Sequence, residues 1–233
     1  MALDTWSAVA NVRLSEVVDS ASVVGDLRFA RSVAVESHGA HAWAYLPGGA
    51  PASGDVWVSP ETFAYGTPGD PGTFNFHVFV HEIGHALGLK HPFEDAPVLS
   101  NDSIKQTVMS YSEKAGVDPF LLTVDHYPET PMPYDVAAIQ YLYGANTTHN
   151  SGDTEYAFSS SGRYRRTIWD GGGTDTIRID GSGASVIDLR APKPSRASAC
   201  RSRSAMAASI ATPLPSPPAS SSRTQSAAVA TIG

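Results

Sequence analysis

The segment that most constrains this chain runs from His81 to His91, because it carries three histidines and a glutamate at fixed spacing. Residues four apart lie on one face of an α-helix, so His81 and His85 can offer ring nitrogens to one ion while Glu82 projects beside it. Gly88 can adopt the left-handed conformation that ends a helix, and the chain then turns back to bring His91 round as a third ligand. The spacing therefore predicts a metal site made of three imidazoles.

Three neutral nitrogen ligands with an open fourth position are typical of a hydrolytic zinc centre. Zinc in such a site lowers the pKa of a bound water from about 15.7 to roughly 7, and Glu82 is the candidate base for the proton of that water. The alternative is a helix whose histidines cap or decorate a buried face. The glycine and the third histidine favour the metal site, because a bare H-E-x-x-H pattern would be a far weaker signal.

A second element follows the histidines, where residues 107–112 carry Met109 and, two positions later, Tyr111. Alone, the methionine would be core filler and the tyrosine a half-buried aromatic residue. Together with the zinc motif, the pair resembles the methionine turn of the serralysin family of metzincins. The resemblance extends from about residue 3 to 190 and includes four further segments, at residues 53–58, 73–77, 133–146 and 168–175.

This resemblance implies an α+β metzincin catalytic domain over residues 1–145, with a twisted, mostly parallel sheet, a zinc-binding helix and a second helix. It implies that zinc is held by His81, His85 and His91. Tyr111 would be a further zinc ligand in the resting enzyme that swings away to hydrogen-bond the tetrahedral intermediate, and Glu82 would be the catalytic base. The implied activity is a zinc-dependent endopeptidase that hydrolyses extracellular proteins, with its polypeptide substrate extended along an edge strand at residues 54–59.

Hydrophobic spacing and turn residues predict the remaining elements of this domain. Helices are expected at residues 3–10, 74–87 and 134–142, and strands at residues 12–18, 24–30, 40–46 and 54–59. The other histidines show no ligand spacing and are expected to be structural or on the surface: His38, His41, His77, His126 and His149.

After residue 146 the sequence changes to short strand patterns separated by Gly and Asp turns. Residues 170–177 approximate the nonapeptide of a calcium-binding parallel β-roll, although Asp-Gly alone also makes a hairpin turn. By resemblance, the first calcium site uses carbonyl, hydroxyl and carboxylate oxygens, which suit this hard cation, from Asn150, Gly152, Thr154, Asp170, Gly172 and Asp175. A second site would start at Gly173 and Asp175, and we expect it to be incomplete. Residues 146–190 are therefore predicted to be the start of such a β-roll.

Composition changes again in residues 191–233, which are rich in Ala, Ser and Pro and contain five basic residues and no acidic one. No hydrophobic periodicity is present, so this tail is predicted to be disordered. A natural divergent tail, a fused segment and a shifted reading frame all remain open as its origin. At the other end, residues 2–12 resemble only the latter part of the family's first long helix, so an N-terminally truncated catalytic domain is expected.

Charge, hydropathy and cysteine content argue against a nucleic-acid-binding, membrane-spanning or disulfide-bonded protein. The net charge of −7 argues against a nucleic-acid partner, because phosphate binding requires a basic surface. No apolar run approaches the roughly 20 residues that cross a bilayer, and the first residues lack the basic flank and apolar stretch of a secretory signal. Cys200 is the only cysteine, so disulfides cannot hold the fold together. We expect a monomer without a membrane partner, and the resemblance implies a secreted protein, although the family's carboxy-terminal export signal is not recognisable.

Two rival functions remain. One is a catalytically impaired, truncated remnant that acts at most as a metal-binding or interaction module. The other is a metal-dependent hydrolase of a non-peptide substrate, which the peptide-pairing edge strand disfavours. Cleavage preference is not predicted, because the loops that shape substrate subsites have no residue code.

Overall fold

The computed structural model describes residues 2–18, 20, 22–65, 69–94, 102–112, 124–182, 186–188, 208–211 and 229–232. The chain divides into two compact units, residues 1–145 and residues 146–233. Among the described helices, none combines the length and the apolar character needed to cross a bilayer.

The sheet of the first unit has three short strands in the order β1-β3-β2, namely β1 Phe29–Arg31, β3 Val56–Val58 and β2 Ala42–Ala44. β1 pairs with β3 in parallel, whereas β2 pairs with β3 antiparallel. The sheet is therefore mixed, and the prediction of a mostly parallel sheet is wrong for the described strands. The reason is that β2 and β3 form a hairpin, in which the Tyr45 N–H donates to the Asp55 carbonyl.

The strand expected at the sheet edge, residues 54–59, lies instead in the centre of the sheet. Its backbone is paired on both sides: the Val56 N–H donates to the Arg28 carbonyl, and the Ser59 N–H donates to the His41 carbonyl. A strand with both ladders filled has no backbone groups left for a peptide. The edges of the sheet are β1 and β2, each of which pairs along one side only among the described strands.

The strand predicted at residues 12–18 does not form. Val12 is buried, but Val17 and Val18 are 48% and 86% exposed, and this run has no partner strand in the described part of the chain. An apolar run of this kind becomes a strand only when a neighbour supplies its backbone hydrogen bonds. Two short elements were not predicted, namely α2 Val33–Ser37 and the 3-10 helix η1 Pro60–Tyr65.

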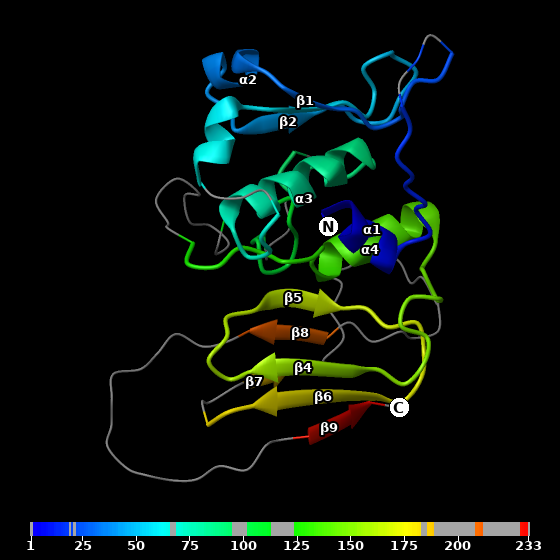
Figure 1. The fold of residues 1–233 in the computed structure, drawn as a ribbon, viewed down its shortest axis with the longest axis vertical. Coiled ribbons are helices and arrows are strands. Elements are labelled where there is room, and N and C mark those ends of the chain that lie inside the picture. The colour runs from blue at the N-terminus through cyan, green and yellow to red at the C-terminus, as the bar shows by residue number, and fades with distance from the viewer. Residues whose placement is uncertain are drawn as a thin grey trace. The chain divides into compact units, whose positions relative to one another are not determined.

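The central helix, α3 Phe74–Ala86, packs between the sheet and two further helices, α1 Ala2–Val9 and α4 Pro133–Tyr143 (Figure 1). The Thr73 side chain caps its first turn by accepting from the Phe76 N–H. On the sheet side, Ala86 joins the core of β3. On the opposite side, the fully buried Trp6 donates from Nε1 to the Val80 carbonyl at 3.2 Å. Covered on both sides, α3 is a rigid base for the side chains it carries.

The described part of the second unit contains strands and turns: β4 Glu155–Ser159, β5 Arg165–Ile168, β6 Asp175–Asp180, β7 Val186–Asp188, β8 Ala208–Ala211 and β9 Val229–Ile232. β4 and β6 pair in parallel, and the side chains of β6 alternate between buried and more exposed positions. Four buried hydrophobic residues of this unit form a cluster, Phe158, Ile168, Ile177 and Ile179.

Strands β8 and β9 lie within residues 191–233, which the sequence predicts to be disordered. β8 pairs antiparallel with β5 and β7, and β9 pairs antiparallel with β6. At these two four-residue strands the structure differs from the prediction. The physical reason is that open strand edges accept short segments containing β-branched residues, even where a segment has no periodicity of its own.

Candidate metal centre

The end of α3 positions the last two histidines of the motif. Gly88 has φ +105°, a left-handed conformation that side chains other than hydrogen disfavour. Its N–H donates to the His85 carbonyl, and the Leu89 N–H donates to the Gly84 carbonyl, which is the hydrogen-bond pattern of a Schellman motif. The turn stops the helix and sends the chain back toward it, as the sequence predicts.

The three histidines of the motif converge on one point. The Nε2 atoms of His85 and His91 lie 3.1 Å apart, and those of His91 and His81 lie 3.2 Å apart. Tetrahedral zinc with Zn–N bonds of about 2.0–2.1 Å places its nitrogens about 3.3–3.4 Å from one another. Among the described residues, these three form the group of His, Cys, Asp or Glu side chains close enough to share a metal ion.

The hydrogen bonds of the Nδ1 atoms show that the converging Nε2 atoms of the three histidines carry lone pairs. Nδ1 of His81 donates to the Val108 carbonyl and Nδ1 of His85 to the Leu89 carbonyl, both at 2.8 Å. Nδ1 of His91 is hydrogen-bonded to a carboxylate oxygen of Glu94. A neutral imidazole that carries its proton on Nδ1 has a bare Nε2. Three bare nitrogens at contact distance repel one another unless a cation lies between them, so this donor set fits a zinc ion.

Burial keeps the first two histidines neutral. Burial lowers the pKa of His81 well below its ordinary value, and it lowers the pKa of His85 as well. The neighbouring imidazoles act in the same direction, because each positive charge disfavours the next. Neutral imidazole is the form that binds a metal ion.

Glu82 lies next to His81 on α3 and is 6% exposed. Its Oε2 atom has no hydrogen-bond partner among the described residues, and burial raises the pKa of Glu82 to about 8. A buried carboxylate without a donor is costly, and a nearby cation or a bound water would offset that cost. Glu82 therefore has one buried oxygen available for a proton, on the same helix as His81 and His85.

Tyr111 reaches the same point from the methionine turn. Its hydroxyl donates to Nε2 of His91 at 2.6 Å, and its ring stacks on His81 with centroids 5.5 Å apart. Burial, followed by the charges of Glu82 and Glu94, raises the pKa of Tyr111 to about 12. The phenol thus stays protonated near neutral pH and can donate a hydrogen bond, although its side chain remains half exposed.

Met109 packs against α3 at Gly84, between the two helical histidines. It is 2% exposed, and a Cβ added at Gly84 would lie 2.7 Å from its sulfur and 3.1 Å from the ring of Trp6. Only a glycine allows the methionine to approach the helix this closely. The glycine between the two helical histidines therefore has a packing reason as well as a place in the motif.

Asp135 holds the methionine turn from the first turn of α4. This buried carboxylate accepts from the Thr107 hydroxyl at 2.5 Å, the Val108 N–H at 2.7 Å and the Met132 N–H at 2.8 Å. The Val108 carbonyl in turn accepts from His81. A continuous set of hydrogen bonds thus connects α4 with a histidine of the candidate metal centre.

The residues expected to bind calcium lie in two loops of the second unit. Asp170 accepts from the Gly172 N–H at 2.8 Å and from the Tyr156 hydroxyl at 2.6 Å, and Asn150 donates to that same hydroxyl at 3.0 Å. Asp175 accepts from the Thr154 N–H at 3.0 Å.

The hydroxyl of Thr154 donates to the Gly152 carbonyl at 3.0 Å, and Gly173 packs against the backbone of Gly152. The structure therefore brings the loop that precedes β4 next to the loop that precedes β6. Both carboxylates already accept protein hydrogen bonds, as the cited distances show.

Sequence reasoning missed the residues that orient the histidines. From the sequence, no role is predicted for Asp135 or Glu94, although an acidic residue just after Pro133 at a helix start is a recognisable capping signal. The backbone carbonyls of Val108 and Leu89 could not have been found, because any residue type supplies a carbonyl.

Comparison with known proteins agrees with this geometry. The family model of matrixin, peptidase M10, matches residues 1–144. Serralysin A of Dickeya chrysanthemi is 36% identical over 201 residues, which covers 78% of this chain and 42% of the relative. Serralysin C of the same organism is 37% identical over 214 residues with the same coverage. Serralysin of Proteus mirabilis is 33% identical over 224 residues, covering 81% of this chain and 45% of the relative.

The chain thus spans less than half of the length of these relatives. The matched region contains the three converging histidines, the buried glutamate and the methionine turn. On the extent of the family match and the identity to several serralysins, this chain belongs to the matrixin family of M10 peptidases, as a metzincin of the serralysin type.

Proposed function

We propose that this protein is a zinc-dependent endopeptidase. The observation that carries the proposal is the convergence of three bare Nε2 atoms, from His81, His85 and His91. Glu82, buried and next to His81 on α3, adds a candidate base. Serralysin and metalloprotease are also the names of the relatives that the chain resembles.

The roles of the residues follow from their positions. The three histidines would hold zinc, which when bound polarises the scissile carbonyl and lowers the pKa of a coordinated water. Glu82, with its available Oε2, would take the proton of the attacking water and pass it to the leaving amine. The Tyr111 hydroxyl would donate to the oxyanion that develops on the scissile carbonyl, and would act as a further zinc ligand before substrate binds.

We place the substrate along the edge strand β2. His41 and Tyr45 direct their backbone groups toward β3, so the intervening Ala42 and Ala44 direct theirs away from the sheet. An extended polypeptide can pair with those groups by backbone hydrogen bonds, which do not depend on its sequence. Secretion and action on extracellular proteins are part of the same proposal, which rests for this on the resemblance to serralysins.

A zinc titration combined with a digestion assay tests the proposal. The purified chain should bind one zinc and digest casein, and removal of the metal with a chelator should stop digestion until zinc is added back. The rival function, a catalytically impaired remnant or interaction module, requires that zinc binds without any cleavage. A chain that cleaves only a non-peptide ester would support the other rival.

Replacing Tyr111 by Phe is expected to lower kcat by about 100- to 1,000-fold, the range for loss of one oxyanion donor, and to change KM much less. The reason is that its hydroxyl would contact charge that develops in the transition state. Steady-state kinetics on a fluorogenic peptide measure both constants.

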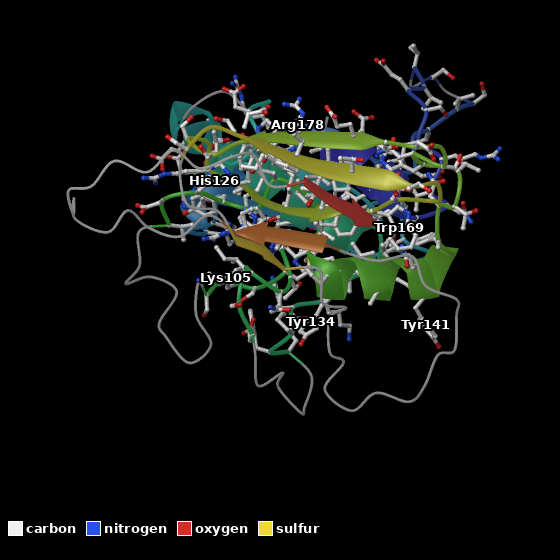
Figure 2. The ribbon with its side chains drawn as sticks, turned by 90° about the horizontal axis from the view of Figure 1, so that it is seen from below. Lys105, His126, Tyr134, Tyr141, Trp169 and Arg178 are labelled. Carbon is white, nitrogen blue, oxygen red and sulfur yellow. The ribbon has the colours of Figure 1, made fainter. Side chains whose placement is uncertain are left out.

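The matched control for this change is Tyr141→Phe. Tyr141 is 83% exposed and points away from α4 into solvent (Figure 2), so loss of its hydroxyl should change neither constant. If Tyr111→Phe behaves like this control, Tyr111 packs against the site without taking part in the reaction.

We also propose that Asn150, Gly152, Thr154, Asp170, Gly172, Gly173 and Asp175 bind calcium in a partial β-roll. The support is the resemblance and the facing of their two loops. Calcium should raise the melting temperature and protect residues 146–190 from proteolysis, because a ligand that binds only the folded state stabilises it by about 2.7 kcal/mol at 100 times its Kd.

Scanning calorimetry and timed proteolysis at increasing calcium check this prediction, with magnesium as a control of equal charge. The Asp170→Asn variant should lose the response to calcium. A melting temperature that ignores calcium would refute the calcium site and leave the zinc site untouched.

A further inference from the structure

His91 differs from the other two histidines of the centre in how it is held. His81 and His85 lie on α3, and each directs Nδ1 to a backbone carbonyl. His91 lies in the segment after α3, outside any helix or strand, so its backbone leaves its ring less constrained. An extra constraint on that ring must come from side chains.

Two residues that follow His91 supply this constraint. A carboxylate oxygen of Glu94 accepts from Nδ1 of His91, and the Glu94 N–H donates to the His91 carbonyl at 3.3 Å, which closes a turn. The Phe93 ring lies flat on the imidazole, with centroids 4.9 Å apart and an angle of 10° between the planes. One contact fixes the rotation of the ring in its plane and the other covers its face.

The same phenyl ring also touches Tyr111, with centroids 5.3 Å apart. Phe93 thus contacts both His91 and Tyr111, which are hydrogen-bonded to each other through Nε2 of His91. Glu94 binds the nitrogen on the far side of the imidazole, so it does not compete for the position of the metal. Both residues act on the centre through His91.

We propose that Phe93 and Glu94 form a clamp that orients His91 and thereby sets how tightly the centre retains its metal ion. The proposal rests on the proposed function, because it takes His91 as a zinc ligand. A carboxylate on the outer nitrogen fixes the tautomer of a histidine ligand and makes it more basic, and loss of such a partner typically costs 10- to 100-fold in metal affinity. The stacked phenyl ring prevents the imidazole from tilting.

The test is the zinc affinity of the purified full chain, measured by competition with a chromophoric chelator. Glu94→Ala should bind zinc about 10- to 100-fold more weakly. Glu94→Gln keeps an acceptor for Nδ1 without its charge and should fall between this variant and the wild type. Phe93→Ala should also bind more weakly, and Phe93→Leu should retain part of the affinity.

Matched controls separate the clamp from general effects of charge or aromatic area. Glu16→Gln removes an exposed carboxylate and Tyr141→Ala removes an exposed aromatic ring, and neither should change zinc affinity. Melting of the metal-free proteins identifies variants with a folding defect. The visible spectrum of cobalt(II)-loaded protein gives a second readout, because a loosened His91 changes the ligand field even when the site is saturated.

The possible results separate the clamp from the function on which it rests. Weaker zinc binding and an altered cobalt spectrum in the Glu94 and Phe93 variants, with unchanged controls, support the clamp. If the wild type binds one zinc and all four variants bind it equally tightly, the clamp is wrong and the zinc centre stands. A wild type that binds no zinc overturns the proposed function, and with it the clamp.

Discussion

In the Glu82→Gln variant, the rate of peptide hydrolysis is expected to fall by about 10²–10⁴-fold, the usual contribution of a positioned acid–base group. The variant should still bind as much zinc as the wild type. Glutamine has nearly the same shape but cannot take a proton from water. Metal content should not change, because the three nitrogens that converge come from His81, His85 and His91 and not from Glu82.

Two measurements on one protein sample check this separation of metal content from activity. Elemental analysis gives zinc per chain, and initial rates on casein and on a fluorogenic peptide give turnover. Glu16→Gln, which changes an exposed carboxylate in the same way, should match the wild type in both. Near wild-type turnover in Glu82→Gln would show that Glu82 is not the catalytic base. Loss of zinc would show that Glu82 helps to hold the ion.

The second large effect is expected at Asp135. Its replacement should lower the free energy of unfolding more than replacement of Glu82 does. Asp135→Ala leaves two buried N–H groups, of Val108 and Met132, and the Thr107 hydroxyl without their acceptor. Each unsatisfied buried group costs about 1–3 kcal/mol, so the change should remove a large part of a typical stability of about 5–15 kcal/mol. Zinc affinity should fall as well, because the Val108 carbonyl positions His81.

Asp135→Asn is the matched variant, because one amide oxygen can still accept from both N–H groups. The Thr107 hydroxyl can reverse to accept from the amide, so this variant should be affected much less. Urea unfolding of the metal-free proteins gives both free energies. Equal stability of the alanine variant and the wild type would show that these hydrogen bonds do not hold the methionine turn.

The pH dependence of unfolding gives a second check on Asp135. Burial raises its pKa from 3.8 to about 7, against the opposing effect of its three hydrogen-bond donors. Between about pH 4 and 7 the folded state then holds a proton that the unfolded state has lost, so stability falls as pH rises. The wild type should therefore lose stability relative to Asp135→Asn over this window, and a constant difference would show that Asp135 is ionised throughout.

The elements best predicted from the sequence are those whose signal is local. The helices at residues 2–9, 74–86 and 133–143 follow from spacing, a capping threonine and a proline at the helix start. The helix end at Gly88 followed in the same way, because its positive φ is a property of one residue.

The strands were predicted less well, because a strand depends on partners that lie far away in the sequence. Residues 12–18 have the composition of a strand but no neighbour among the described residues, and residues 54–59 became the central strand instead of the edge. The strands β8 and β9 in the predicted disordered tail are a further case. In each of these segments, the pairing of backbone groups determined whether a strand formed and where it lies in the sheet. That pairing depends only weakly on residue type, so the sequence does not predict it.

At the candidate metal centre, the sequence by itself determined which atoms can bind an ion. His81, His85 and Glu82 are placed by the period of a helix, and Gly88 returns the chain toward them, so three residue types at fixed offsets suffice. Only the tertiary structure decided how those atoms are held. The Val108 carbonyl, fixed through Asp135, determines which nitrogen of His81 carries its proton, and the carboxylate of Glu94 does the same for His91. Such partners are chosen by packing, because hydrogen-bond acceptors are common along any chain and only the folded geometry brings one of them to a given ring.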